Sequence, residues 1–216
     1  MRRSTPLPPP RSSYRHGDLR RALLDAGIEL AREGGPEAVV LREATRRAGV
    51  VPNAAYRHFA SRLDLLREVR AAALSAVASA MEKELAAVST DGSATEVARA
   101  GVRAVGAGYM RFAREETGLF RTAFFAEPEI LEALGAGPAA SGPGGLNPFE
   151  LLGAALDRLV AVGALPSARR PGAEFLAWSA VHGLALLTIE GPLRGVPAAQ
   201  LDALGQRLLD MVEKGL

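Results

Sequence analysis

The stretch LREATRRAGVVPNAAYRHF, residues 41–59, decides the fold. It places four arginines, one tyrosine and one histidine around a short Ala-Gly-Val break. The residues before the break predict a helix over about 41–48, which Gly49 ends. A second short helix is predicted from Pro52 to about Phe59, because proline suits the first helical position, where no N–H is needed. Two short helices joined by a glycine-containing turn predict a helix-turn-helix.

The residue types of the second helix fit contact with DNA. In this motif the second helix lies in the major groove, while the first crosses the phosphate backbone. Asn53 and Ala54 fall in the first turn, where an asparagine can pair with adenine and an alanine can touch a thymine methyl group. Tyr56, Arg57 and His58 follow, within expected reach of phosphate oxygens.

Helix N-termini add further expected phosphate contacts. Arg42 opens the 41–48 helix and Arg62 opens the next helix, so each helix start combines a positive dipole end with a guanidinium. The predicted DNA-binding set is Arg42, Pro52, Asn53, Ala54, Tyr56, Arg57, His58 and Arg62. Two alternatives stay open at this point. Arg46 and Arg47 could form a solvated face, and Tyr56 could be an ordinary surface aromatic.

The flanking residues complete an N-terminal domain over residues 17–66. Residues 1–16 contain four prolines and four arginines, which predicts a flexible basic arm that either enters the minor groove or stays idle. Asp18 is the expected N-cap of a first helix that ends at Gly34. The sequence SRLD (61–64) is a capping-box pattern and predicts a long connecting helix from Arg62 to about Val88.

The remaining chain, residues 67–216, is also expected to be helical. No run alternates apolar and polar residues as a strand would, so the predicted fold class is all-α. A loop rich in glycine and proline is expected over 135–148. Helices are predicted at about 94–115, 117–125, 127–135, 148–163, 172–190 and 197–214.

Composition and charge favour a DNA-binding protein. The 216 residues are 48% hydrophobic, enough for one domain or two small ones. Residues 1–70 hold 14 arginines and 8 acidic residues, a net charge of +6, whereas residues 71–216 carry −4. A basic segment joined to an acidic remainder is typical of a nucleic-acid reader attached to another module. The alternative is an arginine-rich surface without a nucleic-acid partner.

Other functional classes find little support. No cysteine is present, which excludes disulfides and thiolate metal sites and suits a reducing cytoplasm. The apolar stretch 175–189 is too short to span a bilayer, so no membrane partner is expected. The three histidines are far apart and no metal-ligand or nucleotide-binding motif accompanies them. We therefore predict no catalytic residue, no metal and no cofactor.

The segment ATRRAGVVPNAAYRHFASRLDLL (44–66) resembles the DNA-binding motif of the tetracycline-repressor-like (TetR) bacterial regulators, whose pattern is IAxxAGVSxGxLYxHFxxKxxLL. The resemblance covers about residues 15–68. The positions that match are Ala48-Gly49-Val50, Tyr56, His58-Phe59 and Leu65-Leu66. The departures are Ala44-Thr45 for an aliphatic-Ala pair, Val51 for a Ser/Thr cap, Ala55 for Leu and Arg62 for Lys.

The resemblance implies a C-terminal domain that forms the dimer interface and encloses a small effector. Trp178, His182 and Gly183 have a W-x-x-x-H-G arrangement that resembles the WHG-type C-terminal domain of the family, and residues 117–125 are similar to that class. We expect dimerisation through the last two long helices, around 172–190 and 197–214. Candidate effector contacts, with ordinary core residues as the alternative, are Met110, Phe120, Phe124, Phe125, Leu151, Trp178 and His182.

The predicted function is that of a bacterial cytoplasmic repressor, associated with the nucleoid when bound to DNA. The expected partners are a double-stranded, palindromic operator, a second copy of the chain, and a small, largely apolar effector that releases the operator. An activator, or a DNA-binding protein of the same fold without an effector, is the main alternative. An architectural DNA-binding protein and a helical protein-binding module are weaker ones.

Overall fold

The computed structural model describes residues 16–125 and 138–216. Within these ranges every regular element is a helix, so the predicted all-α class is confirmed. The predicted helix at 127–135 and the predicted arm, apart from His16, lie outside the described residues. The elements are α1 (His16–Gly34), η1 (Pro36–Ala38), α2 (Leu41–Arg47), α3 (Pro52–Ala55), α4 (Arg62–Ala86), α5 (Ala94–Glu115), α6 (Thr117–Ala123), η2 (Pro138–Ala140), α8 (Pro148–Ala161), η3 (Ser167–Arg169), α9 (Ala173–Ile189) and α10 (Ala198–Gly215).

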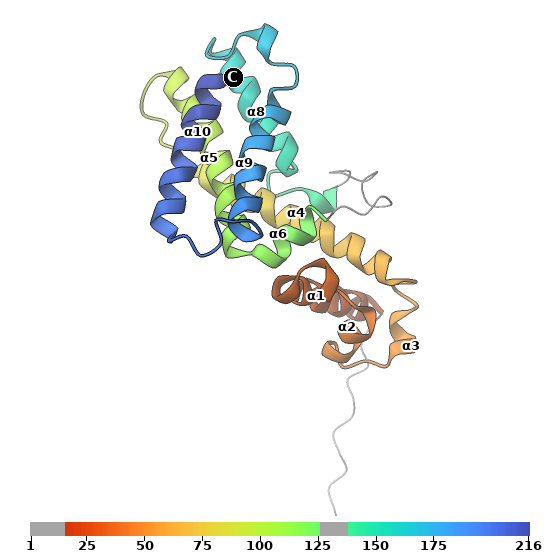
Figure 1. Ribbon diagram of the computed structural model, residues 1–216. Helices are drawn as coiled ribbons and strands as arrows, with labels where there is room; N and C mark the ends of the chain where they lie inside the picture. Colours follow the sequence, from red (N-terminus) through yellow and green to blue (C-terminus); the bar gives the residue numbers. More distant parts are fainter. Residues whose placement is uncertain (1–15, 126–137) are drawn as a thin grey trace, which may run out of the picture.

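The helices form two groups that α4 joins (Figure 1). Helices α1, α2 and α3 pack together at one end, and α5, α8, α9 and α10 stand side by side at the other. Helix α4 begins beside α3 and runs into the second group, where it packs along α5. The short helix α6 lies between the two groups and contacts both α1 and α4. One hydrophobic core therefore runs through both groups.

The N-terminal group packs around large buried side chains. Leu23 of α1, Phe59 in the turn before α4 and Leu65 of α4 are almost fully excluded from solvent. The Arg20 guanidinium lies 5.3 Å from the centre of the Phe59 ring, a cation–π distance, and also pairs with Glu68 of α4 at 2.7 Å. These contacts fix α1 across the start of α4.

Three helix ends differ from the sequence expectation. Helix α1 begins at His16 rather than at an Asp18 cap. Helix α3 ends at Ala55, four residues before the predicted end, and the chain continues as a turn. Ser61 caps α4 by accepting from the Asp64 N–H at 3.1 Å, but the Asp64 carboxylate accepts from Arg67 instead of reaching back. At the start of α4, the ion pair with Arg67 takes the place of the expected Asp64 cap contact.

Two capping boxes begin helices of the C-terminal group. The Ser93 hydroxyl accepts from the Glu96 N–H, and the Glu96 carboxylate accepts from the Ser93 N–H, at the start of α5. Asn147 and Glu150 form the same reciprocal pair at the start of α8. Each box satisfies backbone N–H groups that have no partner inside the helix. In the described part of the chain, no helix has the length and apolar character needed to cross a membrane.

Candidate DNA-binding surface and effector cavity

The turn between α2 and α3 depends on Gly49. Its φ of +68° lies in the left-handed region, which a residue with a Cβ adopts at a cost. The Gly49 N–H donates to the Arg46 carbonyl at 3.3 Å and the Val50 N–H to the Thr45 carbonyl at 3.0 Å, which closes α2. Val51 is the N-cap of α3 and makes no side-chain cap hydrogen bond. The glycine thus sets the direction in which α3 leaves α2.

The outer side of α3 presents polar groups to solvent. Asn53, Tyr56 and Arg57 are exposed, and the Tyr56 side chain remains 58% exposed although it is a large aromatic. Ala55 and Phe59 point the other way and are buried in the core. An exposed tyrosine and asparagine held by a buried anchor on the opposite side are suited to contact a partner surface.

Arg42 extends this surface from the start of α2. Its side chain is exposed, and neither Arg42 nor Arg57 forms a side-chain hydrogen bond or ion pair with another described residue. Ala54 and His58 are half-buried beside them. The predicted DNA contacts Arg42, Asn53, Tyr56 and Arg57 are therefore all accessible to solvent.

Arg46 and Arg47 are engaged within the protein. Arg46 pairs with Glu43 at 2.6 Å, and Arg47 pairs with Glu33 of α1 at 2.6 Å. The hydrogen bond from Arg46 lowers the pKa of Glu43 to about 2. This geometry supports the solvated-face alternative for both arginines.

Arg62 holds the segment before α2 against α4. Its Nε donates to the Val39 carbonyl at 2.8 Å, and one terminal nitrogen donates to the Pro36 carbonyl at 2.7 Å. These carbonyls belong to the loop around η1, so the arginine positions the start of the helix-turn-helix. The phosphate contact predicted for Arg62 stays a prediction.

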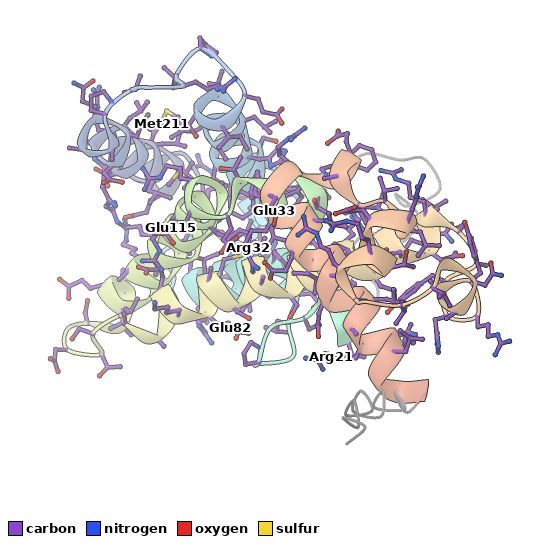
Figure 2. The ribbon with its side chains drawn as sticks, turned by 90° about the horizontal axis from the view of Figure 1, so that it is seen from below. Arg21, Arg32, Glu33, Glu82, Glu115 and Met211 are labelled. Carbon is purple, nitrogen blue, oxygen red and sulfur yellow. The ribbon has the colours of Figure 1, made fainter. Side chains whose placement is uncertain are left out.

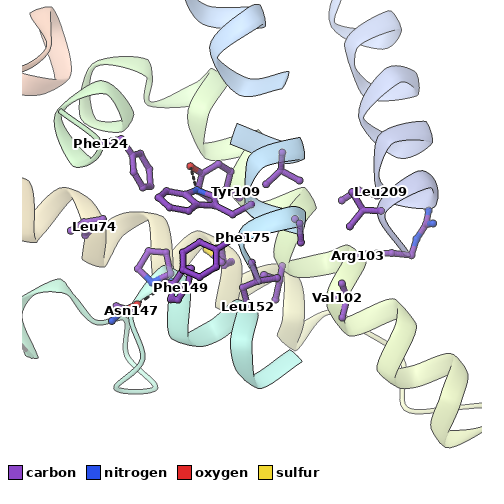
Figure 3. A pocket seen from close by; sticks show the side chains of 18 residues that line it. Leu74, Val102, Arg103, Tyr109, Phe124, Asn147, Phe149, Leu152, Phe175 and Leu209 are labelled. Carbon is purple, nitrogen blue, oxygen red and sulfur yellow. Dashed lines mark hydrogen bonds between the residues drawn. The ribbon is translucent and has the colours of Figure 1, made fainter. Parts of the chain in front are cut away.

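The C-terminal group encloses a cavity of about 250 Å³ between α4, α5, α8, α9 and α10 (Figure 3). Leu74 and Phe124 lie at the end nearest α1, and Arg103 and Leu209 lie at the other end. Phe149 and Phe175 are the exposed large apolar residues of the lining, with ring centres 5.2 Å apart. The lining consists of Leu74, Met81, Val102, Arg103, Val105, Gly106, Tyr109, Phe124, Asn147, Pro148, Phe149, Leu152, Phe175, Ala177, Trp178, Val181, Leu209 and Val212.

The polar groups beside this cavity satisfy one another. The Tyr109 hydroxyl accepts from Trp178 Nε1–H at 3.1 Å and lies 2.7 Å from His182 Nδ1, to which it can donate. Burial raises the pKa of Tyr109 and lowers the pKa of His182, so both side chains are neutral near pH 7. A neutral hydrogen-bonded trio therefore borders a cavity whose other lining residues are apolar except Arg103 and Asn147.

Comparison with protein families identifies the chain. Residues 23–69 match the model described as bacterial regulatory proteins, tetR family, and residues 102–212 match the model described as tetracyclin repressor-like, C-terminal domain. The second match alone covers more than half of the chain. The chain belongs to the TetR family. It is a DNA-binding transcriptional regulator of that family and not an enzyme.

Solved structures show the same fold in proteins of low sequence identity. A protein of unknown function from a Rhodococcus species has a TM-score of 0.71 and 24% identity, over 95% of this chain and 99% of that one. PfmR from Thermus thermophilus, a TetR family regulator, has a TM-score of 0.54 and 23% identity, over 90% and 98%. FadR from Bacillus subtilis, in complex with stearoyl-CoA, has a TM-score of 0.62 and 16% identity, over 91% and 98%. A search of curated sequences finds no relative.

The regulator brings only some of the predicted effector residues to its cavity. Phe124 and Trp178 line it. Phe120 and His182 lie directly behind, with ring centres 5.8 Å apart. Phe125 and Leu151 pack in the core outside the lining, and the WHG subtype remains a prediction.

At two positions the cavity is lined by the residue adjacent in sequence to the predicted one. Met110 faces α10, where its Cε would lie 3.3 Å from a Cβ at Gly205, while the adjacent Tyr109 reaches the cavity. Leu152 lines the cavity in place of Leu151. The unpredicted aromatic lining, Tyr109, Phe149 and Phe175, carried no local signal except its spacing on amphipathic helices.

Helix α6 connects this cavity to the DNA-binding module of the regulator. Gly118 lies so close to the end of α1 that a Cβ there would be 2.3 Å from the Ala31 carbonyl oxygen. Arg32 of α1 pairs with Glu116 at 2.8 Å, and Figure 2 shows Arg32 at this end of α1. Arg121 of α6 bonds to Glu190 at 2.7 Å and to Glu37 of η1 at 3.2 Å. These contacts join α6 to α1, to η1 and to the C-cap of α9.

Proposed function

We propose that this TetR family regulator is a homodimeric repressor that a small effector with an apolar body releases from a palindromic operator. The observation that carries the proposal is the continuous packing between the cavity and α1. Phe124 lines the cavity, Gly118 in the adjoining short helix touches α1, and α1 packs on α2 and α3. A ligand that changes the position of α6 therefore changes the position of the DNA-contacting residues.

An exposed apolar face on α9 and α10 supports a homodimer. Phe175 is 58%, Leu176 68% and Met211 60% exposed, and Figure 2 shows Met211 at the end of the molecule remote from α1. Helix α9 is apolar on all sides, as expected of a helix that is covered all round. Leu186 and Leu187 of α9 and Leu204 of α10 are exposed as well. A second copy that covers this face would place two α3 helices on one side of the dimer.

The substitution Gly183→Ala distinguishes a monomer from a dimer, because it should stabilise an isolated chain but weaken a closely packed dimer. In the single chain nothing lies within 4 Å of a Cβ at Gly183, so Gly183→Ala would stabilise an isolated chain by up to about 1 kcal/mol through helix propensity. If a partner helix packs closely there, the same change weakens the dimer. Sedimentation equilibrium of Gly183→Ala and of Leu176→Glu should show dissociation. Ala86→Glu, at an exposed position of α4, is the control and should remain dimeric.

DNA contact is tested by comparing variants of residues expected to contact phosphates with a variant of a residue expected to contact a base. Arg42→Ala and Arg57→Ala should weaken binding to all sequences and lower the salt slope by about 1 for each lost phosphate contact. Asn53→Ala should instead relax preference at one base position, at a cost of roughly 1–3 kcal/mol there. Equal weakening of all operator variants by Asn53→Ala would remove it from the base-contacting set.

Arg62→Ala serves as an internal control for positioning. Because Arg62 donates to two loop carbonyls, its loss should lower the unfolding midpoint as well as DNA affinity, whereas Arg42→Ala should leave the midpoint unchanged. A normal midpoint combined with a reduced salt slope would favour a direct phosphate contact by Arg62.

Repression is tested by mapping bound sites and measuring transcription of the adjacent genes after deletion of the regulator. Increased transcription supports a repressor, and decreased transcription would identify an activator. The bound sites should be near-palindromes whose half-sites are spaced to place two α3 helices in successive major grooves, about one DNA turn apart. FadR, which has the same fold, was crystallised with stearoyl-CoA, and this supports an effector that carries an apolar chain.

A further inference from the structure

Among the described side chains of residues 16–125, the exposed large apolar ones all lie in the helix-turn-helix. They are Val40, Val51 and Tyr56, with exposed fractions of 43%, 68% and 58%. The other exposed large apolar residues of the described chain belong to α8, α9 and α10. Apolar surface in this half of the molecule is therefore gathered on the segment expected to meet DNA, and Val51 is its most exposed member.

Val51 occupies a position at which a polar residue would stabilise the fold better. It is the N-cap of α3, with φ −73° and ψ 142°, and its side chain forms no cap hydrogen bond. A serine, threonine, aspartate or asparagine at an N-cap accepts from a backbone N–H of the first turn and stabilises the helix. Valine has no acceptor, and its methyl groups remain exposed to solvent instead of entering the core. Neither helix capping nor core packing accounts for a valine here.

The place of Val51 in the molecule leaves it open to DNA. Helix α3 lies at the end of the molecule remote from α9 and α10 (Figure 1), so a second copy docked on those two helices would not cover it. In a helix-turn-helix, the N-terminal residues of the second helix contact base edges in the major groove. Val51 directly precedes the first turn of α3, and Asn53 within that turn is exposed as well. Entry of α3 into the groove would therefore bring Val51 to the base edges.

Thymine is the base that offers an apolar partner in the major groove. Of the four standard bases, only thymine carries a methyl group there, at C5. The methyl groups of a valine are held by its stiff χ1, so their contact with the thymine methyl removes apolar surface from water at little cost in side-chain entropy. Contacts to phosphate oxygens need a hydrogen-bond donor, which the valine side chain lacks. The chemistry of Val51 thus matches a thymine methyl group.

We propose that Val51 contributes to operator recognition by packing against the C5-methyl group of one thymine in each half-site. This rests on the proposed function, in which α3 enters the major groove, and it adds a specificity-determining residue to that function. Burial of one methyl group changes an equilibrium constant by about fourfold. A dimer makes the contact twice, so the two contacts together strengthen operator binding by about 16-fold.

The experiment replaces thymine by deoxyuridine in the operator obtained by mapping bound sites. Deoxyuridine lacks the C5-methyl group and keeps every hydrogen-bonding group of thymine. Each thymine is replaced in turn, at the equivalent position of both half-sites, and the affinity of the full-length protein is measured by fluorescence anisotropy at one salt concentration. The wild type should lose about 16-fold in affinity at the thymine that Val51 contacts. Val51→Ala should reduce this loss to less than about twofold.

Val40 provides a matched control within the same motif. It is the N-cap of α2, is 43% exposed, and likewise forms no side-chain cap hydrogen bond. The first helix of the motif crosses the phosphate backbone, where it meets no base methyl group. Val40→Ala should therefore keep the full preference for thymine over deoxyuridine. A methyl contact made by the half-buried Ala54 would produce a preference at its own thymine that survives in Val51→Ala.

Val51→Ser separates DNA contact from helix stability. Serine supplies the missing cap acceptor but no methyl group, so the unfolding midpoint should rise by about 2–4 °C while the preference for that thymine disappears. If Val51 instead served only to stabilise the fold, the serine variant would have a lowered midpoint and would bind the thymine and deoxyuridine duplexes with equal weakening. That result would overturn the proposal.

The proposal is also overturned by half-sites that contain no thymine, by a wild type that binds the thymine and deoxyuridine duplexes equally, or by a set of preferences that both Val51 variants retain unchanged. Each of these results leaves sequence-specific DNA binding by the regulator intact. Failure of the proposed function gives a different result, because the wild type would then show no preference for the operator over unrelated DNA.

Discussion

Gly118→Ala should separate the two halves of the molecule at their tightest contact. A Cβ at Gly118 would lie 2.3 Å from the Ala31 carbonyl oxygen and 2.4 Å from the Arg32 carbonyl oxygen. To reach an ordinary C···O separation of about 3.3 Å, α1 and α6 must move apart by about 1 Å. Both neighbours are backbone atoms, and the Ala31 carbonyl also accepts the Gly35 N–H that closes α1. The cost should therefore lie in the upper part of the range for overpacking, about 2–3 kcal/mol.

The assay is thermal and urea unfolding of the purified full-length variant. A loss of about 2–3 kcal/mol in a chain of this length lowers the midpoint by roughly 4–12 °C. Gly101→Ala is the matched control, because a Cβ there meets only Leu85 Cδ1 at 3.5 Å. That change should be neutral or stabilise by up to about 1 kcal/mol. If Gly118→Ala unfolds at the wild-type midpoint, the contact between α6 and α1 is looser than the structure requires and the reasoning fails.

Three further predictions concern the C-terminal group. Tyr109→Phe removes the acceptor of Trp178 Nε1–H. The change should lower the free energy of unfolding by about 1–3 kcal/mol and shift tryptophan emission. Unchanged stability and emission would contradict the hydrogen-bonded trio. Burial lowers the folded-state pKa of His182 below 6.5, so the unfolded chain binds a proton first and stability falls as the pH drops from 6.5. His182→Asn should flatten this part of the pH profile, measured by urea unfolding, and an identical slope would argue against it. Asn147→Ala removes the cap of α8 and should cost about 1–2 kcal/mol in the same assay, whereas an effect below about 0.5 kcal/mol would show that the cap is dispensable.

The helix-turn-helix could be predicted because its determinants are local. Gly49 supplies the left-handed turn and Pro52 begins the next helix, and both features depend on a few neighbouring residues. The role of Arg62 could not be predicted, since its carbonyl partners lie 23 and 26 residues earlier in the chain. The early end of α3 also depends on context, because the Phe59 ring is held in the core after the turn.

The sequence predicted an apolar cavity but not which residues line it. Aromatic residues such as Phe124 and Trp178 indicated an apolar site, and both line it. Choosing between adjacent residues requires the rotation of each helix, because neighbours on a helix point about 100° apart. For this reason Tyr109 lines the cavity and the adjacent Met110 does not.

Under the proposed function, coupling between ligand and DNA would run through α6. The Phe120 and Phe124 rings pack on Tyr109, with ring centres 5.2 and 5.5 Å away, so α6 is in contact with the cavity wall. At the start of the same helix, Gly118 leaves no free space against α1. Close-packed elements transmit a displacement because they cannot absorb it. A ligand that displaces Phe124 would therefore either move α1 or break the contact at Gly118. Under the proposed function, the regulator responds to a ligand because Phe124, which lines the cavity, is the C-cap of the helix that contacts α1 at Gly118.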